Sequence, residues 1–230
     1  MLIHGFQTLT LVDFPERVAS ILFTGCCDFR CPYCQNSALV LHPETEPVHS
    51  DEEIFSYLSK RRKMLDGVVV SGGEPTLHRD LPEYLSRIKD LGLEVKLDSN
   101  GNRPEVLRQL VEKSLVDYIA MDVKNCPERY GETIGIPGFS TAAVEESISY
   151  LLTRPVQYEF RTTVVKELHD EASFEALSEL CKGAEAYYLQ CFVPSSHTIR
   201  QGLTPPSPES LARYQAILRR TIGNVQLRDR

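Results

Sequence analysis

The sequence lacks the features that mark secreted and membrane proteins. It has no apolar run close to the roughly 18 residues that a membrane helix needs, and its first residues are soon interrupted by polar ones, so no signal peptide is indicated. Its seven cysteines are odd in number and three of them are clustered, which argues against a secreted disulfide framework. We therefore expect a cytoplasmic protein with no membrane partner.

An excess of basic residues is also missing. The 25 Lys and Arg residues face 32 Asp and Glu residues, which gives a formal net charge of −7. Proteins hold nucleic acids largely through Lys and Arg, so a nucleic acid is not an expected partner. No internal repeat, low-complexity tract or long linker divides the 230 residues, and this length fits one α/β domain. We expect a single domain over residues 1–230.

Apolar strands and amphipathic helices alternate along the chain. The predicted strands cover residues 18–24, 67–71, 93–98, 117–123, 158–165 and 186–193, with a short last strand at 225–227 and an edge strand within 5–16. The first predicted helix begins at Ser50, and the others cover residues 81–91, 104–113, 141–152, 171–181 and 207–220. This alternation is typical of an α/β fold with a parallel sheet covered by helices, but it does not separate an open sheet from a partial barrel.

Three thiols, those of Cys27, Cys31 and Cys34, fall within eight residues directly after the first core strand. Thiolates bind zinc, copper or iron–sulfur clusters, and three of them on one loop cannot all pair as disulfides. A four-iron cluster held by three cysteines has one iron left open for a substrate. A zinc knuckle lacking one ligand, or a cluster of buried thiols, is the simpler interpretation of the same triplet.

The spacing Cys-x3-Cys-x2-Cys, with the aromatic Tyr33 before the last cysteine, resembles the signature of the radical S-adenosylmethionine (SAM) enzymes. Residues 23–36 are similar to the glycyl-radical activating enzymes, above all to the activating protein of anaerobic ribonucleoside-triphosphate reductase. The resemblance implies a partial (β/α)6 barrel and one [4Fe–4S] cluster, held by the three clustered cysteines, that binds SAM. Glu16 and Cys26 stand where such relatives commonly have glycine, and we assign no role to either.

The carboxyl ends of the predicted strands carry further residues of the family's motifs, and sites in parallel α/β folds lie at these ends. Gly72, Gly73 and Glu74 match the Gly-Gly-Glu-Pro motif, whose backbone and glutamate receive the SAM amino group. Asp98 and Asn100 lie in a stretch similar to Asp-Thr-Asn-Gly, which implies that Asp98 accepts from the SAM ammonium and Asn100 meets the ribose or carboxylate. Ordinary turns are the alternative at both places.

Asp122 and Lys124 share one face of the next strand because side chains alternate along a strand. The resemblance implies that Lys124 supplies positive charge to the SAM carboxylate. It also places Asp98 and Asp122 where some activating enzymes hold a monovalent cation. A surface Asp–Lys pair is the common alternative.

Arg161 on the fifth strand lies where the family has an arginine near SAM. A salt bridge to Glu159 or to Asp122 would explain an inward-pointing arginine equally well. Near the last strand, Gln190 is expected in the core, and His197 does not align with a family histidine, so it stays unassigned.

The resemblance implies that the reduced cluster cleaves SAM and that the resulting radical removes a hydrogen atom from a glycine of a partner enzyme. No side chain beyond the cluster and SAM is expected to be catalytic. The expected partner is an anaerobic ribonucleotide reductase, and the expected electron donor is a flavodoxin or a ferredoxin-type protein. The alternatives are a pyruvate formate-lyase-like partner, a small substrate such as a deazapurine precursor, and a zinc-bound interaction module with no catalysis.

Overall fold

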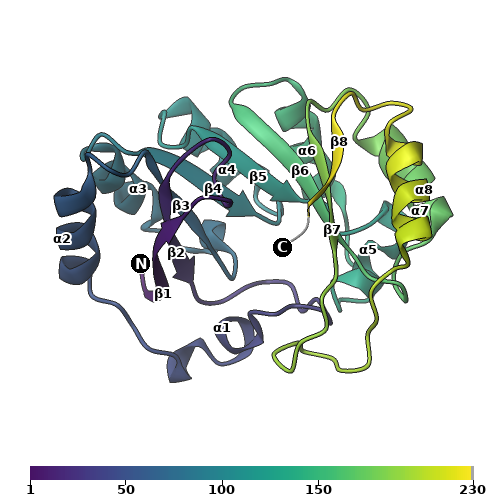
Figure 1. Cartoon of the computed structure of the whole chain (residues 1–230), viewed down its shortest axis with the longest axis horizontal. Helices are drawn as coiled ribbons and strands as arrows, with labels where there is room; N and C mark the ends of the chain where they lie inside the picture. Colours follow the sequence, from purple (N-terminus) through teal and green to yellow (C-terminus); the bar gives the residue numbers. More distant parts are fainter. Residues whose placement is uncertain (229–230) are drawn as a thin grey trace. The chain divides into compact units, whose positions relative to one another are not determined.

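The computed structural model describes residues 1–228 and divides into two compact units (Figure 1). The first unit consists of Met1–Asp28, Asn36–Ser99 and Glu105–Ile119. The second consists of Phe29–Gln35, Asn100–Pro104 and Ala120–Arg230, of which the last two residues lie outside the description. In each unit the strands that pair are successive along the chain.

The first unit carries four strands, β1 (Ile3–Thr10), β2 (Ala19–Thr24), β3 (Gly67–Gly72) and β4 (Glu94–Ser99). β1 pairs antiparallel with β2, while β2–β3 and β3–β4 are parallel. The helices are α1 (Ser37–Leu41), α2 (Asp51–Arg61), α3 (Leu81–Lys89) and most of α4 (Pro104–Glu112). Parallel neighbours need a crossover between them, and α2 and α3 supply it.

Local sequence explains why these elements form where they do. The three valines at 68–70 in β3 are completely buried, as expected of a strand covered on both faces. α2 begins at Ser50, whose hydroxyl accepts a hydrogen bond from the Glu53 amide at 3.1 Å, so the predicted cap is present.

The second unit contains β6 (Gln157–Val164), β7 (Tyr187–Cys191) and β8 (Val225–Arg228), which pair in parallel. Its helices are α5 (Pro127–Thr133), α6 (Ala142–Leu152), α7 (Glu171–Leu180) and α8 (Pro208–Leu218). β5 (Tyr118–Asp122) has residues in both units. α7 and α8 lie side by side (Figure 1), where Phe174 stacks on Tyr214 with ring centroids 4.3 Å apart.

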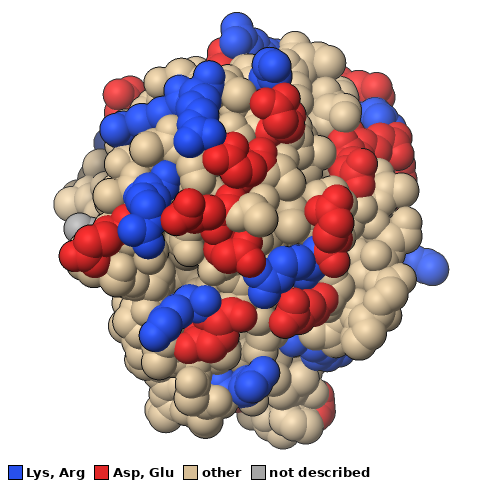
Figure 2. All heavy atoms as spheres, turned by 90° about the vertical axis from the view of Figure 1, so that its right-hand side faces the viewer, with Lys and Arg blue, Asp and Glu red and all other residues tan. Residues whose placement is uncertain are grey.

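The outer face that carries α7 and α8 mixes acidic and basic side chains rather than gathering one sign (Figure 2). Arg213 of α8 pairs with Glu171 at 2.9 Å, and Arg220, just after α8, pairs with Glu175 at 2.7 Å, so ion pairs link α7 to α8 and to the residues that follow it. Exposed pairs of this kind contribute little to stability. This face therefore offers no patch of one charge to a partner.

All predicted strands are present within a few residues of their expected bounds, and so are the long helices. Short helical segments were missed, namely α1, α5 and the 3-10 turns Pro43–Thr45 and Pro75–Leu77. α5 holds Gly131 and only seven residues, so it shows no helical periodicity in the sequence. Within residues 1–228, no helix is both long and apolar enough to cross a membrane.

Candidate functional site

The loop that follows β2 holds Cys27 in a fixed backbone setting within the first unit. The Cys26 amide donates to the Leu39 carbonyl at 2.8 Å, and the Cys26 carbonyl accepts from the Glu74 amide at 2.8 Å. Cys26 itself has φ of 63°, a left-handed conformation that favours glycine. The half-buried Cys27 therefore follows a residue whose amide and carbonyl are both held by hydrogen bonds to other segments.

Gly72 and Gly73 are required by close packing and not only by a turn. Gly72 has φ of 115°, and a Cβ built on it would lie 2.3 Å from the Thr24 nitrogen. A Cβ on Gly73 would lie 1.8 Å from the Cys26 carbonyl oxygen. Because both neighbours are backbone atoms, no side chain can move to make room. The glycines let the end of β3 meet the loop that carries Cys27.

Glu74 is buried, with 1% of its surface exposed. Its Oε1 accepts hydrogen bonds from the Thr76 amide at 3.1 Å, the Thr76 hydroxyl at 2.5 Å and the Ser99 hydroxyl at 2.9 Å. The carboxylate thus ties the end of β3 to the end of β4.

Asp98 lies at the end of β4 beside a buried lysine that the sequence interpretation had not singled out. Lys96 Nζ lies 2.5 Å from Asp98 Oδ1, and the Ser71 hydroxyl donates to Asp98 Oδ2 at 2.9 Å. Lys96 is only 1% exposed. The signal was available in the sequence, because a charged residue stands in the middle of an apolar strand.

Cys31 and Cys34 lie together in the second unit, on one turn closed by a hydrogen bond from the Cys34 amide to the Cys31 carbonyl at 2.9 Å. The turn is held from outside by Arg200, whose amide donates to the Pro32 carbonyl at 2.8 Å. Burial raises the pKa of the Cys31 thiol to about 11, although the Lys124 charge opposes this. A thiol of this kind keeps its proton at neutral pH, and a metal must displace that proton to bind.

Tyr33, between these cysteines, carries a buried hydroxyl that finds no hydrogen-bond partner among residues 1–228. Burial also raises its pKa well above the usual value for tyrosine. A buried hydroxyl without a partner costs about 1–3 kcal/mol, so such groups usually meet a ligand or water. The hydroxyl and the two thiols together fit a bound cluster and its cofactor.

Asp122 lies between two cations in the second unit. Lys124 Nζ is 3.0 Å from one carboxylate oxygen, and Arg161 Nε is 2.9 Å from the other. These cations hold the pKa of Asp122 well below its usual range, even though burial acts in the opposite direction. In this partly buried set, the Asp122 carboxylate thus fixes the positions of both cationic side chains.

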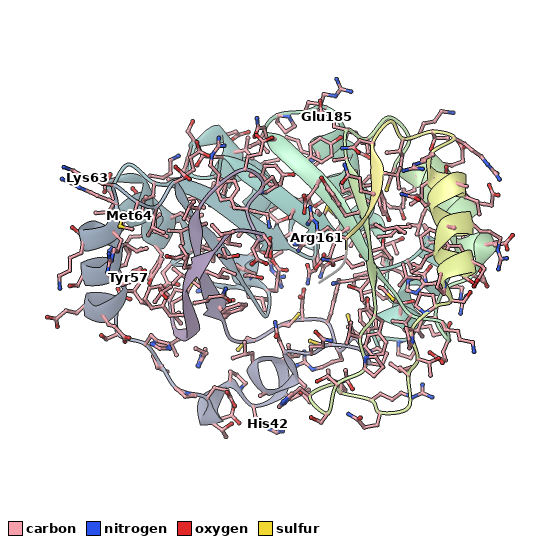
Figure 3. The ribbon with its side chains drawn as sticks, in the orientation of Figure 1. His42, Tyr57, Lys63, Met64, Arg161 and Glu185 are labelled. Atoms are coloured by element: carbon pink, nitrogen blue, oxygen red, sulfur yellow. The ribbon has the colours of Figure 1, made fainter. Side chains whose placement is uncertain are left out.

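Of the two salt bridges expected for Arg161, the one to Asp122 is present. Glu159 is fully buried and pairs with Arg228 of β8 at 2.7 and 2.9 Å. Figure 3 shows Arg161 away from the outer rim of the second unit, where Glu185 lies. Only 11% of the Arg161 side chain is exposed, as expected of an arginine that pairs with Asp122.

His169 positions Lys124 and was missed from the sequence. Its Nε2 lies 2.9 Å from the Lys124 carbonyl, and its Nδ1 accepts from the Val165 amide at 3.1 Å, so Nε2 carries the proton. Burial lowers the pKa of His169 below its usual value, which keeps the ring neutral. A lone histidine after a strand gives no sequence signal for this role.

The remaining candidates have simpler surroundings. Asn100 is buried, and its Oδ1 accepts from the Asn102 amide at 2.9 Å. Gln190 is buried as expected, and His197 is exposed. Over residues 1–228, no three or more His, Cys, Asp or Glu side chains are gathered in a geometry that would hold a metal ion. Cys27 belongs to the first unit and the other two cysteines to the second, so the ligand set stays a prediction.

Comparison with known proteins places this chemistry in a family. The model of the radical SAM superfamily matches residues 21–178. The chain is 31% identical to the "Putative glycyl-radical enzyme activating enzyme" of Methanocaldococcus jannaschii, over 99% of this chain and 95% of that protein. It is also 31% identical to the pyruvate formate-lyase-activating enzyme of Listeria monocytogenes, over 56% of this chain and 55% of that protein.

A solved radical SAM methyltransferase from Sphaerobacter thermophilus shares the fold, with a TM-score of 0.73 over 96% of this chain and 68% of that chain. The sequence identity is 17%, so this likeness concerns the fold alone. The predicted α/β architecture of the radical SAM type is confirmed. The chain belongs to the radical SAM superfamily of enzymes, whose members use a [4Fe–4S] cluster and SAM.

Proposed function

We propose that the protein is an activase that forms a glycyl radical on a partner enzyme, and that this partner is an anaerobic ribonucleotide reductase. The observation that carries the activase role is the similarity to an activating enzyme along 99% of the chain. The cysteine loop and its flanking residues 23–36 support the choice of partner.

The proposed site assigns the cluster to three cysteines and SAM to the residues around them. One [4Fe–4S] cluster would be held by Cys27, Cys31 and Cys34. The SAM amino group would be received by Gly72, Gly73, Glu74 and Asp98, and the SAM carboxylate by Lys124 and Arg161. The remaining contacts would come from Tyr33, Asn100 and Asp122. When bound, the cluster and SAM would supply reductive cleavage and hydrogen abstraction.

The chain's own side chains bind and orient rather than react. Asp122 fixes the positions of the Lys124 and Arg161 side chains, and this supports a role for the two cations in holding the SAM carboxylate. In such a partly buried place, a charge-assisted hydrogen bond is worth about 1.5–3 kcal/mol. Lys124→Ala should therefore weaken SAM binding by about 10- to 100-fold.

The wider setting follows from the same family likeness. We propose that residues 1–230 act as one radical SAM domain, in the reducing cytoplasm, with a flavodoxin or a ferredoxin-type protein as electron donor. A monovalent cation beside Asp98 and Asp122 stays a prediction at this point.

The cluster is tested by reconstitution without oxygen. We expect about four irons per chain, and loss of SAM cleavage in Cys27→Ala, Cys31→Ala and Cys34→Ala. Cys126 is buried near α5 and outside the proposed site, so Cys126→Ala serves as the control and should keep cleavage. Stoichiometric zinc, with no iron–sulfur absorption after reconstitution, would contradict the proposal.

The partner is tested by electron paramagnetic resonance. With reductant and SAM, the protein should produce a glycyl-radical doublet on the anaerobic ribonucleotide reductase of the same source. Deuterium placed in the glycines of that reductase should then appear in 5′-deoxyadenosine. SAM cleavage that begins only when a small molecule is added would instead favour a small substrate.

A pyruvate formate-lyase-like partner is the second candidate. The similarity to the Listeria activating enzyme favours it, although that match covers only 56% of this chain. A doublet on a pyruvate formate-lyase-like protein, and none on the reductase, would keep the chemistry and change the partner.

A further inference from the structure

Lys96 is a charged residue in an apolar setting. It lies in β4 between Val95 and Leu97, which are both completely buried, and it pairs in register with Val69 of β3. Only 1% of Lys96 is exposed. An ammonium removed from water in this way carries a large desolvation penalty unless it finds a negative partner. The position therefore requires a partner, and that partner identifies the role of Lys96.

The partner is Asp98, two residues further along the same strand and thus on the same face. Lys96 Nζ lies 2.5 Å from Asp98 Oδ1, and the Ser71 hydroxyl donates to Oδ2 at 2.9 Å. Each carboxylate oxygen has its own donor, so the carboxylate is held in one orientation. Lys96 also balances its negative charge.

An added monovalent cation does not fit this arrangement at Asp98. A carboxylate attracts a sodium or potassium ion through its negative charge. Oδ1 already contacts the Lys96 ammonium, so a second cation on it would meet the positive charge of Lys96 at close range. The residues present thus disagree with the cation that the family resemblance implied beside Asp98.

We propose that Lys96 is a built-in cation for Asp98. It orients this carboxylate to accept a hydrogen bond from the SAM amino group and takes the place of a bound metal ion, so that SAM binding requires neither Na⁺ nor K⁺. Lys96 is a positioning residue because it acts through Asp98, and its role rests on the proposed function, in which Asp98 contacts SAM.

The test measures SAM affinity of the reconstituted enzyme by equilibrium dialysis, in tetramethylammonium buffer with and without added KCl. The SAM affinity of the wild-type enzyme should differ by no more than about twofold between the two buffers. Lys96→Met keeps the unbranched side chain, one atom shorter, and removes its charge, so SAM should bind about tenfold more weakly without K⁺ and recover when K⁺ is added. A residue that only filled space would show no rescue by K⁺.

Two further variants complete the test. Lys89 also forms an ion pair in the first unit, with Asp117 at 2.6 Å, so Lys89→Met is the matched control and should show no dependence on K⁺. If Lys96→Met does not fold, the double variant Lys96→Met/Asp98→Asn removes both charges and should fold. It should bind SAM weakly and equally in both buffers.

A wild-type enzyme that needs K⁺ or Na⁺ for SAM binding would overturn the proposal, and so would a Lys96→Met variant that K⁺ does not rescue. These failures differ from failure of the proposed function, in which the reconstituted wild-type enzyme binds no SAM in any buffer. Unchanged SAM affinity in Asp98→Ala would overturn the inference as well, because Lys96 would then position a residue that SAM does not meet.

Discussion

Glu16 and Cys26 share an unusual backbone conformation. Their φ angles are 59° and 63°, in the left-handed region. A residue with a side chain loses about 1 kcal/mol of conformational free energy in this region, whereas glycine has no such penalty. These are the two positions where the resemblance places glycine in relatives. The sequence showed both departures, but the backbone angle that explains them comes from the structure.

Replacing Glu16 by glycine should stabilise the protein. Glu16→Gly is expected to raise the free energy of unfolding by about 0.5–1 kcal/mol, because the strain of the left-handed backbone is relieved. Urea denaturation of the cluster-free protein under reducing conditions measures this. Glu16→Ala is the matched control, since alanine keeps the strain. A glycine variant no more stable than the alanine variant would contradict the explanation.

His169 makes stability depend on pH in a predictable direction. Its pKa is lowered in the folded protein, so the unfolded chain binds the proton more readily. The stability that neutral His169 contributes is therefore present above its unfolded pKa of about 6.5 and is lost as pH falls below that value. The loss is at most about 1.4 kcal/mol per pH unit.

The measurement compares the free energy of unfolding at pH 7.5 and pH 5.5. His169→Gln should lose less stability between these values than the wild-type protein, although it is less stable at pH 7.5. His42 is exposed and its ring is 69% accessible, so His42→Gln should follow the wild-type slope. Equal slopes for all three proteins would show that His169 is not responsible.

At the scale of the element, the contact between the end of β3 and the loop after β2 depends on Gly73. In Gly73→Ala the new methyl group would lie 1.8 Å from the Cys26 carbonyl oxygen, and backbone must move to relieve the clash. We expect a loss of about 1–3 kcal/mol or more in the free energy of unfolding.

Gly223 provides the control for this change. It is exposed, and a Cβ at this position would meet no atom within 4 Å, so Gly223→Ala should leave stability nearly unchanged. Denaturation of both variants gives the comparison. Equal stability of the two would mean that the loop relaxes easily and that the glycine is not needed for packing.

The elements also show where sequence reasoning succeeds and stops. Strand alternation predicted that Asp122 and Lys124 lie on one face, as their ion pair confirms, because that depends only on local periodicity. It left open whether Arg161 pairs with Asp122 or Glu159. The choice depends on Arg228, whose side chain reaches Glu159 from another strand 69 residues away. Such a pairing has no local signal.

At the scale of the whole molecule, neither unit is a continuous piece of chain. The chain passes from one unit to the other five times, after Asp28, Gln35, Ser99, Pro104 and Ile119. Because each unit is assembled from three separate segments, it cannot be separated from the other by one cut in the chain. A domain that is joined to its neighbour by a single linker can be separated in this way. The single domain expected over residues 1–230 stays a prediction.

A single domain predicts one cooperative unfolding transition. Hydrogen exchange measured by mass spectrometry along a urea series should show peptides of β3, in the first unit, and of β7, in the second, losing protection at the same midpoint. The two strands are suitable reporters because residues 68–70 of β3 and Leu189 of β7 are completely buried, so both exchange only on extensive opening. Two separated midpoints would mean that the units unfold independently, and the proposal of one domain over residues 1–230 would then be wrong.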